Sequence, residues 1–448
     1  METYGKILLI AMPIFLSLVL LEKWYGWYKG QDTVRNMDMI SSLSSGVTNV
    51  TKDVLGLTLT ILSYDWLVKH IAIYTITSSW VTYVVAFLVL DFSSYWVHRW
   101  SHHINIFWNR HIVHHSSEEF NLACALRQSV SVFVNIFTFL LIPAALLGVP
   151  AQVIAVIAPL HLFAQFWYHT RHIGKMGFLE KIIVTPSHHR VHHAVNPEYL
   201  DKNLAAIFIW WDKWFGTFQE ELPDTPPVYG ITRPVSTWNP IKINFQHMFL
   251  LIKDALRTKS IKDKFRIWFM PTGWRPDDVI EKYPVQKIND VYHFEKYNPK
   301  ASNSLHAWCW VQLITLLLLL SYFFANIASI GKPEIFIYGG FIFLFVYAGA
   351  NLGSCKVHIN FTRYTGKLAC FPYMCYHFLP CFYIIMCTID TGYVHACLQQ
   401  PLYHKNIISI TGFKAYHNAG NSFVTTRAKK HLSSLFKKFP AAFISNHR

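Results

Sequence analysis

Long apolar runs recur along this chain, and they restrict its fold more than any other feature of the sequence. Hydrophobic residues make up 52% of the chain and charged residues only 15%, against about 25% charged in soluble domains. A helix of roughly 20 apolar residues can cross a bilayer because it satisfies its own backbone hydrogen bonds. The sequence therefore predicts an all-α, polytopic integral membrane protein. Its apolar runs are Ile7–Leu21, Val54–Tyr74, Trp80–Val97, Val130–Leu147, Ala151–Tyr168, His306–Ile327, Glu334–Ala350 and Leu368–Ile389.

The first two runs differ from an ordinary span. The charged residues Glu22 and Lys23 follow the first run, where a signal peptide would have small residues at a cleavage site. We therefore expect this run to remain as a membrane anchor. Asp65 and Lys69 interrupt the second run, and charges inside a span are costly. We expect the second run either to cross the membrane or to lie in its interface.

The fourth and fifth runs are separated only by a turn at Gly148 and Pro150, so we expect them to form a hairpin. Residues 98–128 and 169–303 flank this hairpin and should lie on the same side of the membrane. The positive-inside rule assigns both segments to the cytosol, because they contain Arg99, Arg110, Arg127, Arg171, Lys175, Lys181 and Arg190. The basic C-terminal tail also favours the cytosol, although the number of runs puts it on the opposite side. One C-terminal run is therefore expected not to cross.

The formal net charge of +15 first suggests a nucleic-acid partner. We expect none, because the basic residues are scattered among apolar segments and no zinc-finger, RNP-like or helix-turn-helix pattern accompanies them. A basic surface that faces anionic membrane lipids explains the charge better. The eight cysteines include no CxxC pair, so no thiolate metal site is expected.

Histidine is the other unusual component, because 13 of the 24 histidines fall between His98 and His193. Residues three and four apart share a helix face, so closely spaced histidines can direct their imidazoles to one point. Because the clusters follow the third and fifth apolar runs, we expect them to converge near the cytosolic interface. The three clusters are His98-Arg-Trp-Ser-His102 with His103, His111-Ile-Val-His114-His115, and Ser187-His188-His189-Arg-Val-His192-His193.

Two further groups accompany these clusters inside the apolar runs. His161, Gln165 and His169 recur at every fourth position near the end of the fifth run and share a helix face. Ionisable residues inside a span are usually functional, and His169 lies nearest the interface, so we select it as a ligand. Asp91 precedes His98 by about two helical turns and is expected to orient a ligating imidazole.

The number of imidazoles predicts two metal ions. A single zinc takes four ligands, whereas eight or more imidazoles suit two ions with five or six ligands each. Imidazole accepts Zn, Cu, Fe and Ni, so the spacing alone does not name the metal. The sequence contains no HExxH, GxSxG, Walker or dinucleotide-binding pattern.

The histidine clusters and the phrases around them resemble a known family. The three boxes, HxxxH, HxxHH and HxxHH, resemble the fatty acid hydroxylase superfamily of membrane di-iron enzymes. The flanking phrases resemble, within it, the alkylglycerol monooxygenases, from about Phe15 to Trp274. These phrases are Asp91-Phe-Ser-Ser-Tyr-Trp-Val-His98, His114-His115-Ser-Ser-Glu118-Glu119-Phe-Asn121, Ala125-Leu-Arg127-Gln128-Ser129, Gln165-Phe-Trp-Tyr-His169, Thr185-Pro-Ser-His188-His189, Asp201-Lys-Asn203 and Trp211-Asp212-Lys-Trp-Phe-Gly216.

The resemblance implies an organisation for the whole chain. A histidine-box di-iron centre would face the cytosol from the endoplasmic reticulum membrane, capped by amphipathic and cytosolic helices. The expected parts are N-terminal anchor segments (1–79), a fatty acid hydroxylase catalytic core (80–220), a cytosolic cap (221–303), a C-terminal transmembrane region (304–400) and a polar basic tail (401–448).

The resemblance also implies a chemistry. Such an enzyme uses two iron ions, tetrahydrobiopterin and dioxygen to hydroxylate the ether-linked carbon of a 1-O-alkylglycerol drawn from the bilayer. The hemiacetal then breaks down to a fatty aldehyde, which an aldehyde dehydrogenase would consume, and a glycerol. Asp91, Glu118 and Asn121 are expected to orient the site, while His103 stands where the family carries Glu. The implied metal ligands are His98, His102, His111, His114, His115, His169, His188, His189, His192 and His193.

Two other functions remain open from the sequence. A sterol or fatty-acyl hydroxylase or desaturase of the same superfamily would take electrons from a separate cytochrome b5. A histidine-rich metal transporter would belong to a different class, but transporters usually space their ligands along a path and often show inverted repeats. The predicted clustering of histidines at one membrane face counts against a transporter.

Overall fold

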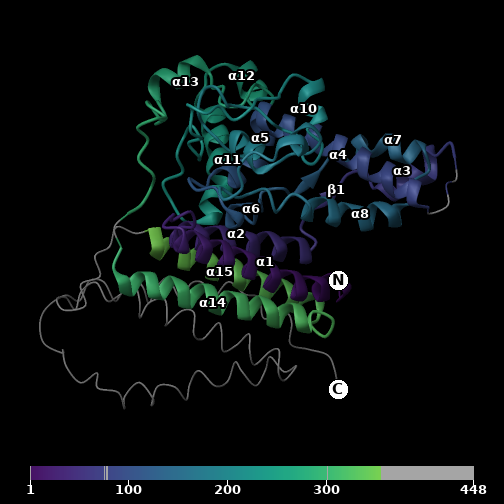
Figure 1. Cartoon of the computed structure of the whole chain (residues 1–448), viewed down its shortest axis with the longest axis horizontal. Coiled ribbons are helices and arrows are strands. Elements are labelled where there is room, and N and C mark those ends of the chain that lie inside the picture. The colour runs from purple at the N-terminus through teal and green to yellow at the C-terminus, as the bar shows by residue number, and fades with distance from the viewer. Residues whose placement is uncertain (1, 75, 77–78, 300, 355–448) are drawn as a thin grey trace, which may run out of the picture. The chain divides into compact units, whose positions relative to one another are not determined.

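Helices make up nearly all of the regular structure in the computed structural model (Figure 1). The structure describes residues 2–74, 76, 79–299 and 301–354, all of which belong to the first of two compact units, Met1–Leu368. The predicted run Leu368–Ile389 and the basic tail lie outside the described residues.

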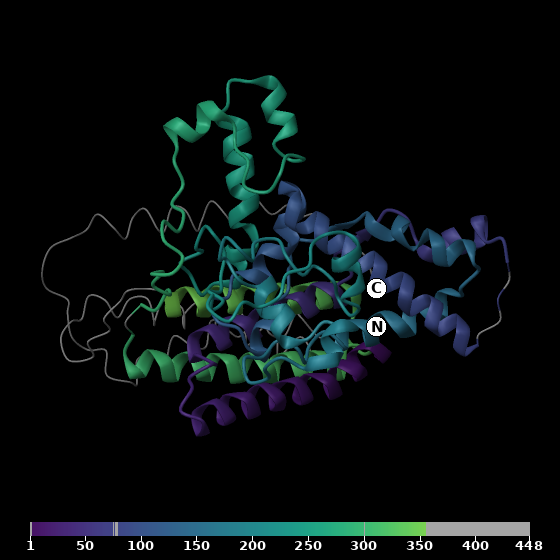
Figure 2. The ribbon, with the colours of Figure 1, turned by 45° about the horizontal axis from the view of Figure 1, so that its top comes forward.

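Four helices are long and apolar enough to cross a membrane. They are α1 (Glu2–Tyr28), α4 (Trp80–His103), α14 (Asn303–Asn326) and α15 (Lys332–Ser354). They confirm four of the predicted spans, and the protein is a multi-pass membrane protein. Helices α1 and α15 both pack against α14, and Figure 2 shows these helices running alongside one another. Ser302 starts α14, because its hydroxyl accepts a hydrogen bond from the Leu305 N–H.

The other predicted runs within the described residues form only short elements, which corrects the prediction of two long spans for the fourth and fifth runs. The segment 54–74 contains β1 (Leu59–Thr60) and α3 (Tyr64–Ile71). The segment 130–147 contains β2 (Val134–Asn135), the 3-10 helix η1 (Phe137–Leu141) and α7 (Ile142–Leu146). The fifth run forms α8 (Ala151–Phe163). Strands β1 and β2 pair in parallel, so these two segments run side by side.

Local backbone chemistry explains why the apolar segment 130–168 does not form two long helices. Its first residues are rich in β-branched side chains, which favour extended backbone. Pro143 lies in the first turn of α7, and Gly148 follows its end with a positive φ of 72°. A Cβ at Gly148 would overlap the carbonyl of Tyr74, so only glycine fits this turn. The turn returns α8 to pack against the N-terminal half of α4.

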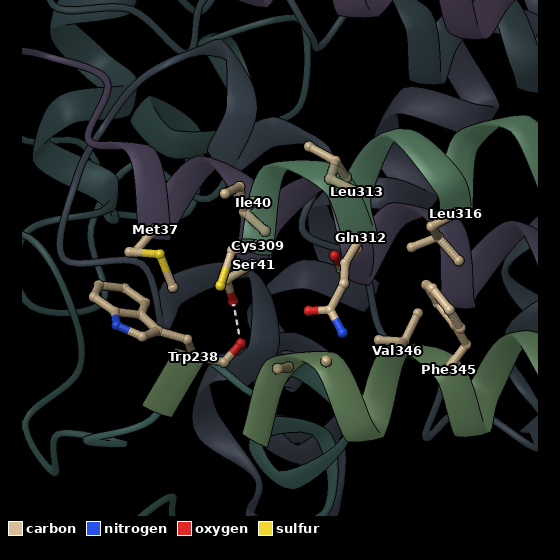
Figure 3. A pocket seen from close by; sticks show the side chains of 13 residues that line it. Met37, Ile40, Ser41, Trp238, Cys309, Gln312, Leu313, Leu316, Phe345 and Val346 are labelled. Carbon is tan, nitrogen blue, oxygen red and sulfur yellow. Dashed lines mark hydrogen bonds between the residues drawn. The ribbon is translucent and has the colours of Figure 1, made fainter. Parts of the chain in front are cut away.

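Helix α2 (Asn36–Val54) connects the long apolar helices to the rest of the protein. It packs against α14 and α15 on one side and α6 (Leu122–Ala125) on another. A cavity of about 30 Å³, the size of one water, lies between α2, α14 and α15 beside Gln312 (Figure 3). Ser41 of α2 donates a hydrogen bond to the Trp238 carbonyl at 2.8 Å, which ties α2 to the segment before α11.

The remaining helices are short, apart from α11, and lie between α4 and α14 in the sequence. Helix α11 (Pro240–Arg257) is amphipathic and begins at Asn239, whose side chain accepts from the next two backbone N–H groups. Its buried face packs against α5, and His247 donates to the Asn105 carbonyl at 2.9 Å. The other helices are α5 (Asn105–His115), η2 (Gly177–Lys181), α9 (Pro186–His192), α10 (Trp210–Trp214), α12 (Ile261–Arg266) and α13 (Asp277–Lys282).

Candidate metal centre

Nine of the ten histidines predicted as ligands lie in two adjacent groups. Within each group, one ring nitrogen of every histidine lies within 4.8 Å of the others. The rings of His115 and His193 link the groups, with centroids 4.4 Å apart. The first, the five-histidine group, contains His98, His102, His111, His115 and His192. The second, the four-histidine group, contains His114, His169, His189 and His193.

Helix geometry divides the second and third histidine boxes between the two groups, whereas both histidines of the first box, His98 and His102, lie in the five-histidine group. On α5, His111 and His115 are four residues apart and share a face, with their Nε2 atoms 3.0 Å apart. His114 lies about 100° around the same helix and turns toward His169 instead, at 3.3 Å. On α9, His192 likewise belongs to the five-histidine group, whereas His189 belongs to the four-histidine group. A dinuclear arrangement therefore follows from two short helices placed against the end of α4.

Hydrogen bonds hold several imidazoles by their Nδ1 atoms. An imidazole that donates from Nδ1 presents the lone pair of Nε2, which is the state that a metal requires. The Nε2 atoms of these rings consequently face the interior of their groups. Three of the anchors are backbone carbonyls: Leu204 for His98 (2.7 Å), Lys202 for His192 (3.0 Å) and Gln165 for His169 (3.0 Å).

The inward nitrogens are crowded and incompletely satisfied. The Nε2 atoms of His98 and His111 lie 2.8 Å apart, and those of His169 and His189 lie 2.9 Å apart. Among the described residues, the Nε2 atoms of His102 and His192 are buried without a hydrogen-bond partner, which is costly unless something binds there. This donor set fits two metal ions of the kind that prefer nitrogen ligands, with no carboxylate in either group.

Burial favours the neutral form of the seven imidazoles that lie outside α4, because it lowers the pKa of each. It lowers the pKa of His114 to about 4. It also lowers the pKa of His111, His115 and His189 well below the usual value, and neighbouring histidines lower these values further because like charges repel. Neutral imidazole is the metal-binding form, so the centre needs no deprotonation to bind metal at neutral pH.

Asp201 is a site residue that the sequence reasoning missed. Its Oδ1 lies 3.0 Å from Nδ1 of His102, which makes it the carboxylate that orients a histidine of the five-histidine group. Asp201 adopts a left-handed backbone conformation with φ of 56°. The signal was present in the phrase Asp201-Lys-Asn203, but spacing along the chain does not show that this turn meets α4.

Asp91 was expected to orient a ligand and instead holds a loop. It is fully buried, and its Oδ1 accepts from His161 at 2.8 Å and from the Ile207 N–H at 3.0 Å. Its Oδ2 accepts from the Phe208 N–H at 3.0 Å and from the Trp211 indole at 2.8 Å. His161 belongs to neither group. Asp91 thus holds residues 207–211 in place, just after Leu204, whose carbonyl accepts the hydrogen bond from His98.

Glu118 and Asn121 also lie apart from the two groups. The Glu118 carboxylate accepts a hydrogen bond from the Tyr297 N–H, and burial raises its pKa to about 7. Asn121 caps α6 by accepting from the Cys124 N–H at 3.2 Å and donates to the Thr33 carbonyl at 2.8 Å. Within the described residues, neither side chain hydrogen-bonds to a histidine of the groups. These three hydrogen bonds connect backbone segments rather than orient a histidine.

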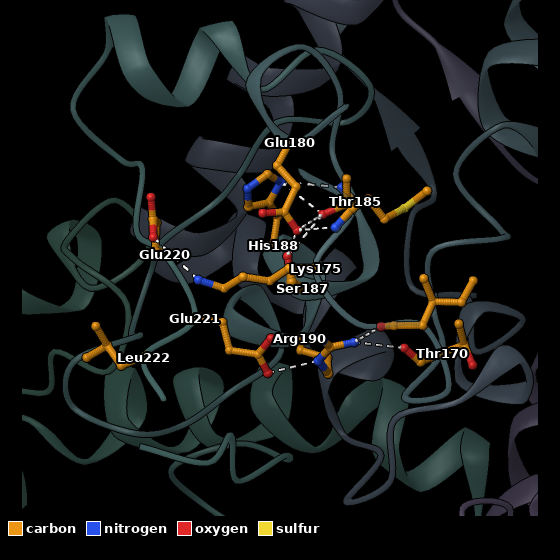
Figure 4. Close-up of polar contacts among 12 residues, drawn as sticks. Thr170, Lys175, Glu180, Thr185, Ser187, His188, Arg190, Glu220, Glu221 and Leu222 are labelled. Carbon is orange, nitrogen blue, oxygen red and sulfur yellow. Dashed lines mark hydrogen bonds and ion pairs between the residues drawn. The ribbon is translucent and has the colours of Figure 1, made fainter. Parts of the chain in front are cut away.

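His188 is the predicted ligand that the structure leaves outside both groups. Its Nδ1 lies 3.3 Å from the Thr185 hydroxyl on the outer side of α9. Figure 4 shows this outer network, in which Glu180 accepts from Ser187 and Arg190 pairs with Glu221. These contacts hold the outer side of α9 in place, so that His189 faces the four-histidine group.

The resemblance implies Glu at the position of His103. The His103 side chain is exposed at the end of α4. Its backbone carbonyl accepts a hydrogen bond from the Thr272 N–H at 3.1 Å. His103 belongs to neither histidine group.

Comparison with known proteins agrees with this geometry. The family model described as fatty acid hydroxylase matches residues 83–217, the part of the chain that carries all nine histidines. Alkylglycerol monooxygenase of Homo sapiens is 36% identical over 342 residues, covering 75% of each chain. That of Xenopus tropicalis is 36% identical over 70% of this chain and 69% of its own, and that of Danio rerio is 39% identical over 59% of each. No solved structure matches. The chain therefore belongs to the alkylglycerol monooxygenase family.

Proposed function

We propose that the protein hydroxylates the ether-linked carbon of 1-O-alkylglycerols, which releases a fatty aldehyde and a glycerol. The observation that carries this proposal is the pair of adjacent histidine groups in a chain that is 36% identical to a human alkylglycerol monooxygenase over 75% of its length. An unactivated C–H bond demands an oxidant that side chains cannot supply. A nitrogen-lined site for two metal ions is therefore the feature that such a reaction needs.

The cofactors proposed are two iron ions and tetrahydrobiopterin, with dioxygen as co-substrate. When bound, the iron would supply the oxidising power for C–H cleavage. The five-histidine group would hold one ion and the four-histidine group the other. The chain's own contribution is positional: backbone carbonyls and Asp201 fix the imidazole tautomers. Phe120 and Tyr168 pack on rings of the four-histidine group and keep water from it.

The membrane setting suits a lipid substrate. Helix α4 carries His98 and His102 at its last two turns, so the centre adjoins the end of a membrane-crossing helix. An alkyl chain can remain in apolar surroundings while the glycerol end reaches the histidines. We place the protein in the endoplasmic reticulum membrane with this centre toward the cytosol, where an aldehyde dehydrogenase would consume the product.

The test is an assay of membranes that contain the protein, supplied with a labelled 1-O-alkylglycerol. One sample receives tetrahydrobiopterin and another receives NADH with cytochrome b5. We expect fatty aldehyde only with the pterin, at least a hundredfold less in His115→Ala, and no change in His293→Ala, which alters an exposed histidine outside the centre.

Other outcomes identify the alternatives. Turnover of a sterol or acyl lipid with cytochrome b5, and none of the ether lipid, would assign the protein to the other oxidases of the superfamily. Tightly bound iron with no turnover of any lipid would favour a metal-binding or transport role. Either result contradicts the proposed function.

A further inference from the structure

The α11–α12 arm, which we define as residues 253–270, bears a group of exposed large apolar side chains. It runs from the last turns of α11 through α12 to the loop that follows, and Figure 2 shows these helices in green at the top of the view. The four side chains, each 70–76% exposed, are Leu256, Ile261, Phe265 and Phe269. Ile261 and Phe265 are four residues apart on α12 and share a helix face. Exposed apolar groups gathered in this way mark an interaction surface.

The charge of the arm is positive because its two carboxylates are already paired. Asp254 is buried against Arg275, and Asp263 pairs with Arg266. The exposed cations of the arm are Lys253, Arg257, Lys259 and Lys262. Apolar residues interspersed with cations are typical of segments that lie in the interface of a membrane with anionic lipids.

Hydrogen bonds attach the arm to the end of α4 and the start of α11 to α15. Asn105, two residues after α4, donates its N–H to the Met270 carbonyl at 3.0 Å, and Phe269 directly precedes this contact. Helix α11 begins beside α15, where the Asn239 side chain donates to the Tyr347 carbonyl at 3.0 Å. The bilayer that contains α4 and α15 is therefore within reach of the exposed side chains.

A bilayer fits this surface better than a second copy of the chain does. The chain has 40 Lys and Arg against 25 Asp and Glu, which gives a formal net charge of +15, so two copies repel one another. Anionic headgroups supply the opposite charge, and the acyl region beneath them accepts the apolar side chains.

We infer that the α11–α12 arm docks on the bilayer that holds the protein, with its four exposed apolar side chains inserted and its cations against anionic headgroups. Docking is independent of the proposed reaction, because it concerns only the contact with lipid. Helix α11 also packs against α5, the helix of the second histidine box, so the arm connects the bilayer to the surroundings of the metal centre.

The experiment replaces Phe265 of the full chain by the photoreactive p-benzoylphenylalanine, which keeps an aromatic side chain at an exposed position. The protein is placed in vesicles of phosphatidylcholine and phosphatidylserine, at a ratio of about four to one, and irradiated. We expect lipid adducts in which the ratio of phosphatidylserine to phosphatidylcholine exceeds that of the vesicle by about fivefold, the enrichment that one cation near the surface gives. Mass spectrometry of the labelled peptide identifies the lipid.

Two further positions of the photoreactive residue serve as controls. Leu318 is exposed on the membrane-crossing helix α14, and this position should give lipid adducts at the ratio of the vesicle. Tyr292 is exposed and its hydroxyl donates to the Glu198 carboxylate, so this position should give few lipid adducts.

Surface substitutions separate the two parts of the contact. Lys253→Gln, Lys259→Gln and Lys262→Gln together should return the ratio of the adducts at Phe265 to that of the vesicle. The control Lys282→Gln, on α13, should leave the enrichment unchanged. Leu256→Ser with Ile261→Ser should lower the total yield of lipid adducts several-fold, because fewer apolar side chains then hold the arm in the bilayer.

The outcomes that overturn docking are distinct from one another. No lipid adduct at Phe265, with adducts at Leu318, would show that the arm does not reach the bilayer. Adducts with a second copy, or with another segment of this chain, would assign the surface to a protein contact instead. Lipid adducts at the ratio of the vesicle, unaltered by the lysine substitutions, would overturn the recognition of anionic lipid.

Discussion

Several histidines of the centre are oriented by a contact on the outer ring nitrogen, which turns the other nitrogen inward. The outer nitrogen of His98 donates to the Leu204 carbonyl and that of His102 meets Asp201, while the inner nitrogens face one another. The sequence predicts the inner contacts, because spacing of three and four residues places imidazoles on one helix face. It does not predict the outer contacts, since Leu204 and Asp201 reach α4 only through the tertiary fold.

Asp201→Asn tests the outer contact at the five-histidine group. Asparagine keeps the size of the side chain but removes the charge that favours donation from Nδ1 of His102, so the ring is less firmly oriented. We expect bound iron and turnover to fall by about tenfold to a hundredfold. The matched control is Asp290→Asn, which alters an exposed carboxylate–imidazole pair with His293 and should change neither quantity. Full iron content in Asp201→Asn would show that the contact is dispensable.

His247 makes stability depend on pH. Burial lowers its pKa to about 4 from the usual 6.5. The unfolded chain therefore binds a proton first, so the contribution is complete above about pH 6.5 and is lost as the pH falls toward 4. His247→Gln keeps a donor for the Asn105 carbonyl but does not titrate. We expect the melting temperature of this variant to fall less between pH 7 and pH 5 than that of the unaltered protein. Equal falls would contradict the assignment.

At the scale of elements, apolar content predicts burial better than it predicts helix length. Runs without breakers, such as those of α4 and α14, form the expected long helices. The segment 130–168 is equally apolar, yet it becomes a strand and short helices, because Pro143, Gly148 and the pairing of β1 with β2 set its course. Strand pairing between segments some 75 residues apart, Leu59 with Val134, is a tertiary event that a hydropathy pattern does not contain.

Asp91 links α4 to the loop that anchors His98. The Asp91 carboxylate accepts from four buried donors through two oxygens, whereas the side chain of Asp91→Asn has only one acceptor oxygen. Each buried donor left without an acceptor costs about 1–3 kcal/mol. We expect the melting temperature to fall by several degrees and the iron content to fall with it. Asp65→Asn is the control, because its carboxylate is exposed and pairs with Lys69 on a helix surface. An unchanged melting temperature and iron content in Asp91→Asn would remove this role.

The buried pair of Arg127 and Asp38 joins α2 to the segment after the second histidine box. Arg127 Nη2 donates to Asp38 Oδ1 at 2.8 Å, with both side chains almost fully buried. Arg127→Met leaves a buried carboxylate without its cation, and we expect a loss of about 3–5 kcal/mol of stability. The double variant Arg127→Met with Asp38→Asn should lose less than Arg127→Met alone. Denaturant unfolding measures both, and a larger loss in the double variant would contradict the pairing.

At the scale of the whole molecule, the histidines from both sides of the α7–α8 turn meet at one centre. Residues 98–115 precede this turn and residues 169–193 follow it, as the prediction of a common membrane side requires. The sequence predicts the two-metal arrangement through the spacing of its histidines, and it indicates the family through the phrases that flank them. It does not predict the Leu204 carbonyl and the Asp201 carboxylate that orient the rings, since they reach the histidines only after folding.

The most direct test of this account is the iron content of the purified, catalytically active protein. The account predicts two iron ions per chain, one or fewer in His115→Ala and in His189→Ala, which each alter one of the two groups, and two in the control His293→Ala. A protein that turns over ether lipid while holding no more than one iron per chain would contradict the dinuclear centre.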